Sequence, residues 1–445
     1  MYKELKEGNM MDEDKKRTVI LFGAGAVIDF GGPTTWELTE SIKDYGFYCK
    51  DNETRITKFI YEVLSKEGYD ETEINFETII NIIEDFIIYY SYADRKKTNS
   101  FSKVFLDSKF EDELLNFSIR GGEEKHGYTI NIPKVPQDFI KNSYSNESPK
   151  QFFLQHLLVN LLTDISNRIS KYTYHTKGHS LVVTDEKKEL NENFQNWMKQ
   201  ISKNSILRMY TLNYDRVFKI LSERVGIKVF EGFDTGEFVP QENVNIDLKK
   251  ILSDFDCNVH YSLHGSVFWR IKTRENGFEI DPQVILKPYP GLPINSTDLP
   301  MLQMEKGKNI LMSNIVTGYH KTQKSFLSPF RQMQSTFDRD CMLTNEMYII
   351  GYSFGDAHIN TSIKNAVVHN EKLVLNFVDP SLSNVIDIDS NKNNMERILI
   401  DILKKESLAM VKSQKIIRDD YHEYFNGKIK INIVGMKDFL KAQLM

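Results

Sequence analysis

The fold of this chain is decided by the stretch Ile206-Leu207-Arg208-Met209-Tyr210-Thr211-Leu212-Asn213-Tyr214-Asp215. Its first half is mostly apolar and predicts a buried strand, and apolar residues at helical spacing between positions 217 and 221 predict a helix after it. Asn213 and Asp215 therefore stand in a turn that joins the carboxyl end of a strand to a helix. Because open α/β sheets bind their ligands at such turns, we expect both side chains to belong to a functional site.

The same pattern, a strand followed by a polar or glycine-rich turn, recurs along the chain. The further turns are Gly23-Ala24-Gly25 after a strand at 18–22, His264-Gly265 after 259–263, Gly351-Tyr352-Ser353-Phe354-Gly355-Asp356 after 347–350, and Asp379-Pro380 after 373–378. Strands that alternate with helices predict an α/β fold with a doubly wound, mostly parallel sheet. If these turns meet at one edge of the sheet, their backbone, hydroxyl and carboxylate groups suit the pyrophosphate and ribose groups of a dinucleotide.

Each of these turns also has a structural explanation when it is taken alone. Gly23-Ala24-Gly25 lacks the third glycine of the usual dinucleotide fingerprint and is equally compatible with a turn that binds nothing. His264 is compatible with a structural histidine, and Asp379-Pro380 with a plain turn. The prediction of a dinucleotide site therefore depends on the conjunction of the turns.

The composition predicts a folded, globular protein. Of the 445 residues, 40% are hydrophobic, 27% are charged and 12% are aromatic, which argues against extensive disorder. The net charge of −5 gives no overall attraction to nucleic acid, so direct binding of nucleic acid is not expected. No apolar run approaches the ~18 residues of a membrane span, and the charged start of the chain lacks a signal-peptide core. We expect a cytoplasmic protein without a membrane contact.

Neither a disulfide framework nor a metal site is predicted. Cys49, Cys257 and Cys341 lie far apart with no CxxC pair, and we interpret all three as buried thiols. The histidines include no HExxH motif and no close cluster with carboxylates.

The sequence predicts a core made of two segments with a large insertion between them. The expected divisions are residues 16–44 with 205–385 as the dinucleotide-binding core, 45–204 as a mainly helical insertion, and 386–445 as C-terminal helices and an edge strand that pack on the core. In the insertion, amphipathic stretches at 76–90 and 152–169 predict helices. In the last segment, helices are expected at 395–403 and 436–444 and the edge strand at 428–434.

Four of the motifs resemble, in kind and in order, signatures of the sirtuin superfamily. They are the GAG turn at Gly23, the TxNxD turn at Thr211, the HG turn at His264 and the GxS turn at Gly351. The resemblance covers about residues 16 to 40 and 205 to 382. It implies a Rossmann-like sheet that binds NAD and an enzyme that cleaves the bond between nicotinamide and ribose.

The chain departs from the sirtuin deacylases in two features. Cys341 is the only cysteine beyond His264, so the four-cysteine zinc ribbon is missing, and Pro33 is followed by Thr34-Thr35-Trp36 instead of Asp-Phe-Arg. Together with the helical insertion, these departures resemble the sirtuin-like NAD hydrolases of bacterial anti-phage systems. In those systems an activated effector depletes cellular NAD, so that infection aborts.

The resemblance implies that NAD+ is the substrate and that no metal takes part. Asn213 would orient the ribose and a water, His264 would act as base toward a ribose hydroxyl or that water, and Asp215 would position Asn213 or stabilise positive charge. The residues implied in NAD+ binding are Gly23, Ala24, Gly25, Ala26, Asp29, Thr34, Thr211, Gly351, Ser353 and Asp379. Among these, the GAG turn and Ser353 would hold the pyrophosphate, and Asp379 the adenosine ribose.

Uncontrolled hydrolysis of NAD+ would harm the cell that makes the enzyme, so we expect the activity to be gated. The resemblance favours a homo-oligomer and a partner or activator from a defence system, for example a translocase-type ATPase or a nucleotide-processing subunit. Three other classes stay open. They are a zinc-free protein deacylase or ADP-ribosyltransferase, a non-catalytic module that senses NAD or ADP-ribose, and a hydride-transferring Rossmann dehydrogenase.

Overall fold

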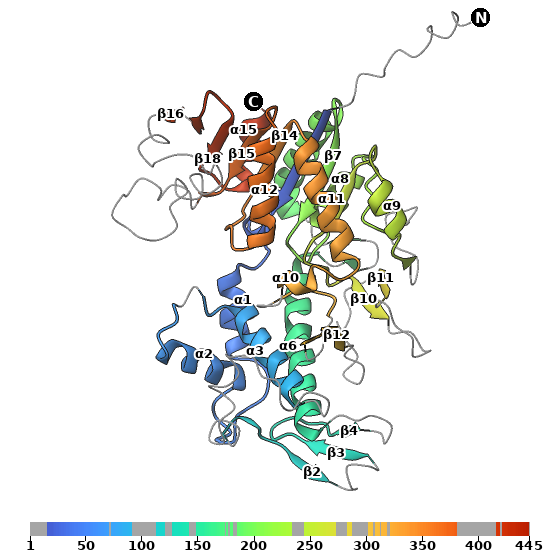
Figure 1. Cartoon of the computed structure of the whole chain (residues 1–445). Helices are drawn as coiled ribbons and strands as arrows, with labels where there is room; N and C mark the ends of the chain where they lie inside the picture. Colours follow the sequence, from blue (N-terminus) through green and yellow to red (C-terminus); the bar gives the residue numbers. More distant parts are fainter. Residues whose placement is uncertain are drawn as a thin grey trace, which may run out of the picture.

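The computed structural model describes residues 16–70, 73–90, 113–120, 127–141, 148–173, 175–176, 179–180, 185–233, 244–272, 283–286, 301–305, 308–311, 313–317, 321–380, 415–418 and 421–444. The chain is a mixed α/β protein built around a mostly parallel central sheet, which confirms the predicted fold class (Figure 1). Within these residues, no helix combines the length and the apolar character needed to cross a membrane.

The central sheet has eight strands in the part of the chain that is described, in the order β16-β17-β18-β15-β14-β1-β7-β9. The strands are β1 (Lys16–Phe22), β7 (Ser205–Thr211), β9 (Val259–Ser262), β14 (Glu346–Ile350), β15 (Val374–Val378), β16 (Lys415–Ile417), β17 (His422–Tyr424) and β18 (Ile429–Asn432). All neighbours from β18 to β9 are parallel. Phe22 is in register with Ile350 and with Thr211, so β1, β14 and β7 end at the same level.

The direction in which the chain builds this sheet reverses at β1. After β1 the chain adds β7 and β9 on one side, and it then returns to add β14, β15 and β18 on the other side. Connections leave the ends of β1 and β14 in opposite directions, and this opens a crevice beyond the two strand ends. The two predicted glycine turns, at Gly23 and Gly351, both begin there.

Helices cover both faces of the sheet. They are α7 (Lys188–Ser202), α8 (Val217–Glu223), α11 (Phe330–Leu343), α12 (Ala357–His369) and α15 (Met436–Leu444). Phe22 stacks on Phe218 of α8, with ring centroids 3.8 Å apart, and also lies against Phe194 of α7. Tyr210, which points to the opposite face because side chains alternate along a strand, packs on Phe337 of α11. Both faces of the sheet are therefore buried, as in a doubly wound fold.

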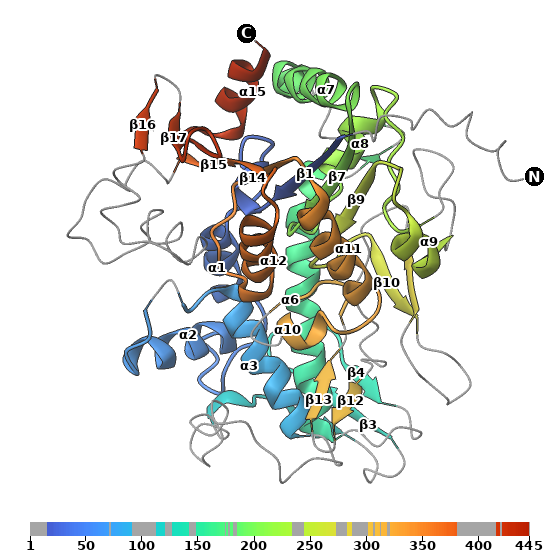
Figure 2. The same cartoon turned by 45° about the horizontal axis from the view of Figure 1, so that its top comes forward.

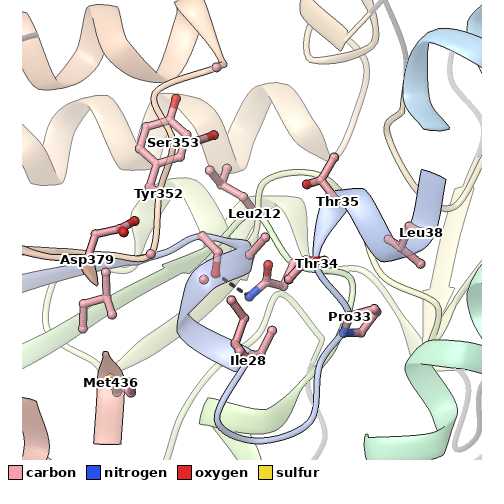
Figure 3. A pocket seen from close by; sticks show the side chains of 18 of the residues that line it. Ile28, Pro33, Thr34, Thr35, Leu38, Leu212, Tyr352, Ser353, Asp379 and Met436 are labelled. Carbon is pink, nitrogen blue, oxygen red and sulfur yellow. Dashed lines mark hydrogen bonds between the residues drawn. The ribbon is translucent and has the colours of Figure 1, made fainter. Parts of the chain in front are cut away.

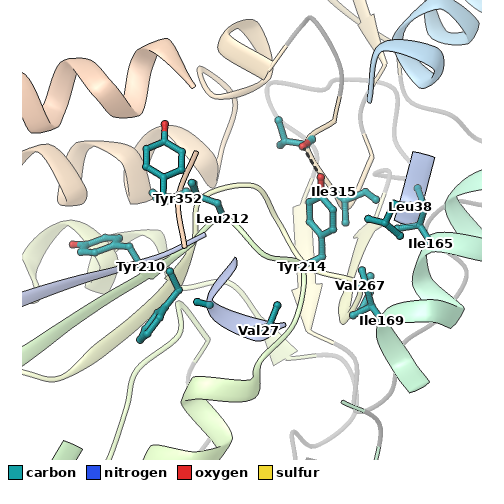
Figure 4. Packing of buried hydrophobic residues seen from close by; sticks show 14 of the residues in the cluster. Val27, Leu38, Ile165, Ile169, Tyr210, Leu212, Tyr214, Val267, Ile315 and Tyr352 are labelled. Atoms are coloured by element: carbon teal, nitrogen blue, oxygen red, sulfur yellow. Dashed lines mark hydrogen bonds between the residues drawn. The ribbon is translucent and has the colours of Figure 1, made fainter. Parts of the chain in front are cut away.

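A mainly helical part of the chain adjoins the carboxyl edge of the sheet (Figures 1 and 2). Its elements are α1 (Thr35–Lys43), α2 (Ile56–Lys66), α3 (Phe76–Tyr89), α6 (Pro149–Thr173) and a small antiparallel sheet of β2 (Ser118–Arg120), β3 (Tyr128–Asn131) and β4 (Phe139–Lys141). Figure 4 shows Leu38 of α1 beside Ile165 and Ile169 of α6 and Tyr214 of the turn after β7. These side chains join the helical part to the sheet.

Two helices pack against elements across the predicted segment boundaries. Helix α1, in the segment 16–44 that was predicted as core, packs against α2 and α3. Helix α7, in the segment 45–204 that was predicted as insertion, packs against β7, α8 and α15. The apolar stripe of a helix does not reveal which neighbour it will face, and for these two helices the neighbour lies across the boundary.

The remaining elements are short. They are η1 (Ala24–Val27), β5 (His175–Thr176), β6 (His179–Ser180), η4 (Asp185–Lys187), β8 (Val244–Asn245), α9 (Leu248–Ser253), β10 (Trp269–Lys272), β11 (Gln283–Leu286), β12 (Met301–Glu305), β13 (Lys308–Leu311) and α10 (Lys321–Lys324). β10, β11 and β8 form a three-stranded sheet, and β12 pairs with β13.

The C-terminal strand is present but does not lie at the edge of the sheet. The predicted strand 428–434 corresponds to β18, and β17 and β16 continue the sheet beyond it. A turn at 425–427 with three successive positive φ angles reverses the chain and brings β17 alongside β18. The predicted helix 436–444 is α15, and the predicted helix 395–403 lies outside the described residues.

Candidate active site

A cleft of about 560 Å³ lies beyond the carboxyl ends of β1 and β14. In Figure 3, Asp379 and Met436 lie on one side of this cleft, and Pro33, Thr34 and Leu38 lie on the other. Most of the predicted site residues line it, namely Gly23, Ala24, Gly25, Asp29, Thr34, Asn213, His264, Gly351, Ser353 and Asp379. The structure therefore brings the turns after β1, β7, β9, β14 and β15 into one cavity.

The two glycine turns are packed directly on each other. The N–H of Gly23 donates to the carbonyl of Ile350 (2.9 Å), and the N–H of Gly25 donates to that of Gly351 (2.9 Å). A Cβ atom on Gly25 would lie 2.7 Å from the Cα of Gly351, whose own φ of +60° favours glycine. The close approach of the two turns is thus sufficient to require these glycines, whether or not a phosphate also contacts the backbone.

Two helices begin at the cleft. Helix α1 starts after Thr34, whose hydroxyl accepts from the N–H of Glu37 (3.1 Å), while the N–H of Thr34 donates to Oε2 of Glu37 (2.7 Å). This capping box fixes the first turn of the helix. Helix α12 starts after Asp356, which also lines the cleft. The positive ends of both helix dipoles favour an anionic ligand such as a diphosphate at this position.

Asn213 is held in the cleft by two hydrogen bonds. Its Nδ2 donates to the carbonyl of Gly23 (2.9 Å), and its backbone N–H donates to Oγ1 of Thr211 (3.0 Å). The first bond ties the turn after β7 to the turn after β1. With Nδ2 committed in this way, Asn213 can offer its Oδ1 to a water or a hydroxyl group in the cleft.

His264 follows β9 and is 3% exposed. Its Nε2 lies 3.8 Å from Oδ1 of Asp356, and the imidazole also has a hydrogen bond to the backbone of Leu212. Burial lowers the pKa of His264 to about 3, although the carboxylate of Asp356 opposes the shift. The imidazole is therefore neutral at pH 7 and can accept a proton, and Asp356 is placed to stabilise the imidazolium that results.

Asp356 belongs to a charged network that the sequence analysis did not identify. Nζ of Lys321 lies 2.7 Å from Oε2 of Glu77 and 3.2 Å from Oδ1 of Asp356, and the hydroxyl of Tyr214 donates to Glu77 (3.4 Å). Burial alone would raise the pKa of Asp356, but His264 and Lys321 outweigh it, so that this pKa is lowered. Of these two groups, Lys321 is the cation that is present at neutral pH.

Asp215, predicted as a catalytic residue, does not line the cleft. It is 1% exposed, its Oδ2 accepts from the hydroxyl of Tyr172 (2.8 Å), and its Oδ1 accepts from the N–H of Val217 (2.9 Å). Burial raises the pKa of its carboxyl group, and both hydrogen bonds oppose that shift. Tyr172 does line the cleft, so Asp215 can act there only by positioning this side chain and the turn before α8.

Three other predicted binding residues are buried or engaged in contacts within the protein. Ala26 is fully buried and lies outside the lining of the cleft, and Thr211 is 1% exposed and supports the backbone of Asn213. Asp29 lines the cleft, but its Oδ2 accepts from the N–H of Lys437 in the first turn of α15 (2.8 Å). Oγ1 of Thr211 and Oδ2 of Asp29 are thus already engaged in hydrogen bonds within the protein.

Among the described residues, no group of three or more His, Cys, Asp or Glu side chains is placed to hold a metal ion. All three cysteines are free thiols. Cys49 and Cys341 are buried as predicted, whereas Cys257 is only half-buried.

No protein-family model and no curated protein matches the chain. Among solved structures, a complex of a Sir2 homologue with NAD is 13% identical, with 98% of this chain and 94% of that chain covered, at a TM-score of 0.33. A mutant Sir2 homologue in complex with 2'-O-acetyl ADP ribose is 12% identical, with 82% and 81% covered, at a TM-score of 0.32. Similarity at these TM-scores supports no conclusion about function.

Proposed function

We propose that the chain is an NAD+ hydrolase that cleaves the bond between nicotinamide and ribose. One observation carries the proposal. The turns after β1 and β14, at the point where the strand order reverses, share a single cleft with Asn213 and His264. Dinucleotides bind at such reversal points in doubly wound sheets, and here two polar side chains suited to bond cleavage lie in the same cavity.

The cleft fits NAD+ in size and in charge. Its volume of about 560 Å³ is in the range of pockets that bury most of a ligand. The starts of α1 and α12 favour the pyrophosphate, and Ser353 can donate a hydrogen bond to it. Asp379, at the end of β15, is the carboxylate that would accept from ribose hydroxyls.

Asn213 and His264 would divide the chemistry between them. Asn213 offers its Oδ1 to the attacking water or to a ribose hydroxyl. His264, neutral at pH 7, takes a proton from that water as its oxygen bonds to C1′ of the ribose and the bond from C1′ to nicotinamide breaks. Asp356 stabilises the imidazolium formed in this step, and the products are nicotinamide and ADP-ribose, with one proton released to solvent.

The order of the motifs and the missing zinc ribbon further support a role in anti-phage defence, in which the enzyme depletes NAD+ and infection aborts. Activity would then be gated by assembly into a homo-oligomer or by a partner protein. The helical part supplies Glu77, which is bound to Lys321 beside His264 and Asp356. A movement of α3 caused by such a partner would reach the active site through this contact.

The proposal is tested by incubating the full-length protein with NAD+ and measuring nicotinamide and ADP-ribose by chromatography. We expect Asn213→Ala and His264→Ala each to lower the rate by about 10²-fold or more. His422→Ala, which changes a histidine on β17 outside the cleft, should keep the parental rate.

Parental rates in both cleft variants would show that the site is wrong. Binding of ADP-ribose, measured by calorimetry, separates a gated enzyme from a protein that has no nucleotide site. A parent protein that neither hydrolyses NAD+ nor binds ADP-ribose would overturn the proposal. Transfer of ADP-ribose to an added peptide, instead of to water, would assign the chain to the transferases.

A further inference from the structure

The end of the cleft that lies opposite Asp379 belongs to the helical part of the chain. Leu38 of α1 is found there (Figure 3), and it lies beside Ile169 of α6 (Figure 4). Phe76, at the start of α3, is tied to the same place, because its N–H donates to Oγ1 of Thr39 (2.9 Å). Leu38, Phe76 and Ile169 line the cleft, and none of them is more than 6% exposed. This end of the cleft therefore has an apolar wall, which three helices supply.

Tyr172 adds an aromatic ring to this wall. It follows Ile169 by three residues, so both side chains lie on one face of α6, and both residues line the cleft. The hydroxyl of Tyr172 donates to Oδ2 of Asp215 (2.8 Å), and Oδ1 of Asp215 accepts from the N–H of Val217 (2.9 Å). The hydroxyl is thus already paired, and the ring is the part of this side chain that is left to meet a ligand. Asp215 holds the ring against the turn after β7, two residues beyond Asn213.

The order of the groups in NAD+ brings its base to this wall. With the adenosine ribose at Asp379 and the pyrophosphate at the glycine turns, the nicotinamide riboside is the part that remains. Its C1′ lies where Asn213 and His264 act, and the ring that C1′ carries extends toward the end of the cleft opposite Asp379. A flat aromatic ring there meets an apolar wall that contains a tyrosine. Aromatic rings in contact stabilise each other beyond the effect of the area that they bury.

We propose that Tyr172 contacts the nicotinamide ring of NAD+ and that Asp215 is a positioning residue for Tyr172. This subsite for the leaving base depends on the proposed function. The helical part of the chain then selects the base, whereas the turns of the sheet hold the ADP-ribose part of the substrate. Asp215 acquires a role in substrate binding although its carboxylate does not line the cleft.

The test compares the affinities of NAD+ and ADP-ribose, because ADP-ribose carries a hydroxyl group in place of the nicotinamide ring. Both are measured by calorimetry on the full-length His264→Ala protein, which should not consume NAD+. We expect NAD+ to bind about tenfold more tightly than ADP-ribose, the effect of one base stacked on an aromatic side chain. Equal affinities would overturn the subsite, and this comparison needs no change at Tyr172.

Variants in the same His264→Ala protein test the two residues. Tyr172→Leu should weaken NAD+ binding by about fivefold or more and change ADP-ribose binding by less than about twofold, because only the contact with the base is lost. Tyr172→Phe keeps the ring, so NAD+ binding should stay within about threefold of its original affinity. Asp215→Ala should weaken the binding of NAD+ more than that of ADP-ribose, which the loss of a purely structural residue would not do. Tyr61→Leu is the control, since it changes a half-buried tyrosine of α2 that does not line the cleft, and it should change neither affinity.

Equal weakening of both ligands by Tyr172→Leu, or no effect on either, would overturn the role of Tyr172. Equal weakening of both ligands by Asp215→Ala would overturn its positioning role. If Tyr172→Leu fails to fold, which circular dichroism reveals, the comparison of NAD+ with ADP-ribose still tests the subsite. Binding of ADP-ribose without tighter binding of NAD+ would overturn this subsite alone. Absence of binding of either ligand would overturn the proposed function and the subsite together.

Discussion

Replacing Asp356 by asparagine removes one negative charge from beside His264 and keeps the shape of the side chain. The carboxylate oxygen lies 3.8 Å from Nε2 of His264, and two unit charges about 4 Å apart interact by about 4 kcal/mol at an effective dielectric constant of about 20. If an imidazolium forms in the rate-limiting step, this energy corresponds to a rate loss of up to about 10³-fold, because each 1.36 kcal/mol is a factor of ten. We expect a loss of about 10²- to 10³-fold for Asp356→Asn.

The assay is the steady-state rate of nicotinamide release from NAD+ at neutral pH. The loss should appear in kcat and leave KM almost unchanged, because Asp356 stabilises a charge that exists only after the proton has moved. Asp338→Asn on α11 is the matched control, since its exposed carboxylate binds the hydroxyl of Ser362 and does not line the cleft. A parental kcat for Asp356→Asn would refute the assigned role of the carboxylate, and an equal loss for Asp338→Asn would show that the effect is not specific to His264.

Three further predictions concern stability. A Cβ on Gly25 would lie 2.7 Å from the Cα of Gly351, so Gly25→Ala should lower the free energy of unfolding in urea by about 1–3 kcal/mol. Gly355→Ala is the control, because its new Cβ would meet no atom closer than 3.8 Å and should leave the free energy of unfolding nearly unchanged. Similar losses at both sites would contradict this explanation. Lys324→Met removes the ammonium group whose Nζ lies 2.8 Å from Oε1 of the buried Glu84, and it should lower the free energy of unfolding in the same measurement by up to about 3–5 kcal/mol. A change near zero would show that the pair is not buried in solution. Burial lowers the pKa of His260 from 6.5 to about 4, so the unfolded chain takes up a proton below pH 6.5 that the folded chain does not take up until about pH 4. The parent protein should therefore lose stability as the pH falls from 6.5 to about 4. The loss in the His260→Gln variant should be smaller than in the parent by up to about 3 kcal/mol. Identical profiles of stability against pH would show that His260 does not cause this loss.

The sequence predicted the parallel core because each of its long strands has a local signal. Thr18 to Phe22, Ile206 to Thr211 and Met347 to Ile350 are apolar runs followed by turn residues, and all three are strands of the central sheet. The carboxyl ends of parallel strands lie at one edge of a sheet. The predicted strands before Asn213 and His264 therefore implied that these two residues lie close together. In the structure both residues line the same cleft.

The charged network was missed for a physical reason. Glu77 is in the first turn of α3, Lys321 starts α10 and Asp356 precedes α12, so three segments far apart in sequence supply one cluster. No spacing rule links such residues, and each alone reads as an ordinary surface charge. For Asp215 the sequence predicted a functional side chain where the structure has a buried one. Its motif marked it as functional, yet its carboxylate is buried and bound to Tyr172, and a strand-end position does not specify the direction of a side chain.

The contact between Asp29 and Lys437 has a consequence for the protein during its synthesis. It joins residues 408 positions apart, and Val434, Gly435 and Met436 complete one wall of the cleft. A ribosome-bound chain contains Asn213 and His264 long before this wall has been translated. If the chain hydrolyses NAD+ as proposed and needs the intact cleft to hold it, hydrolysis can begin only after α15 has been translated and has left the ribosome.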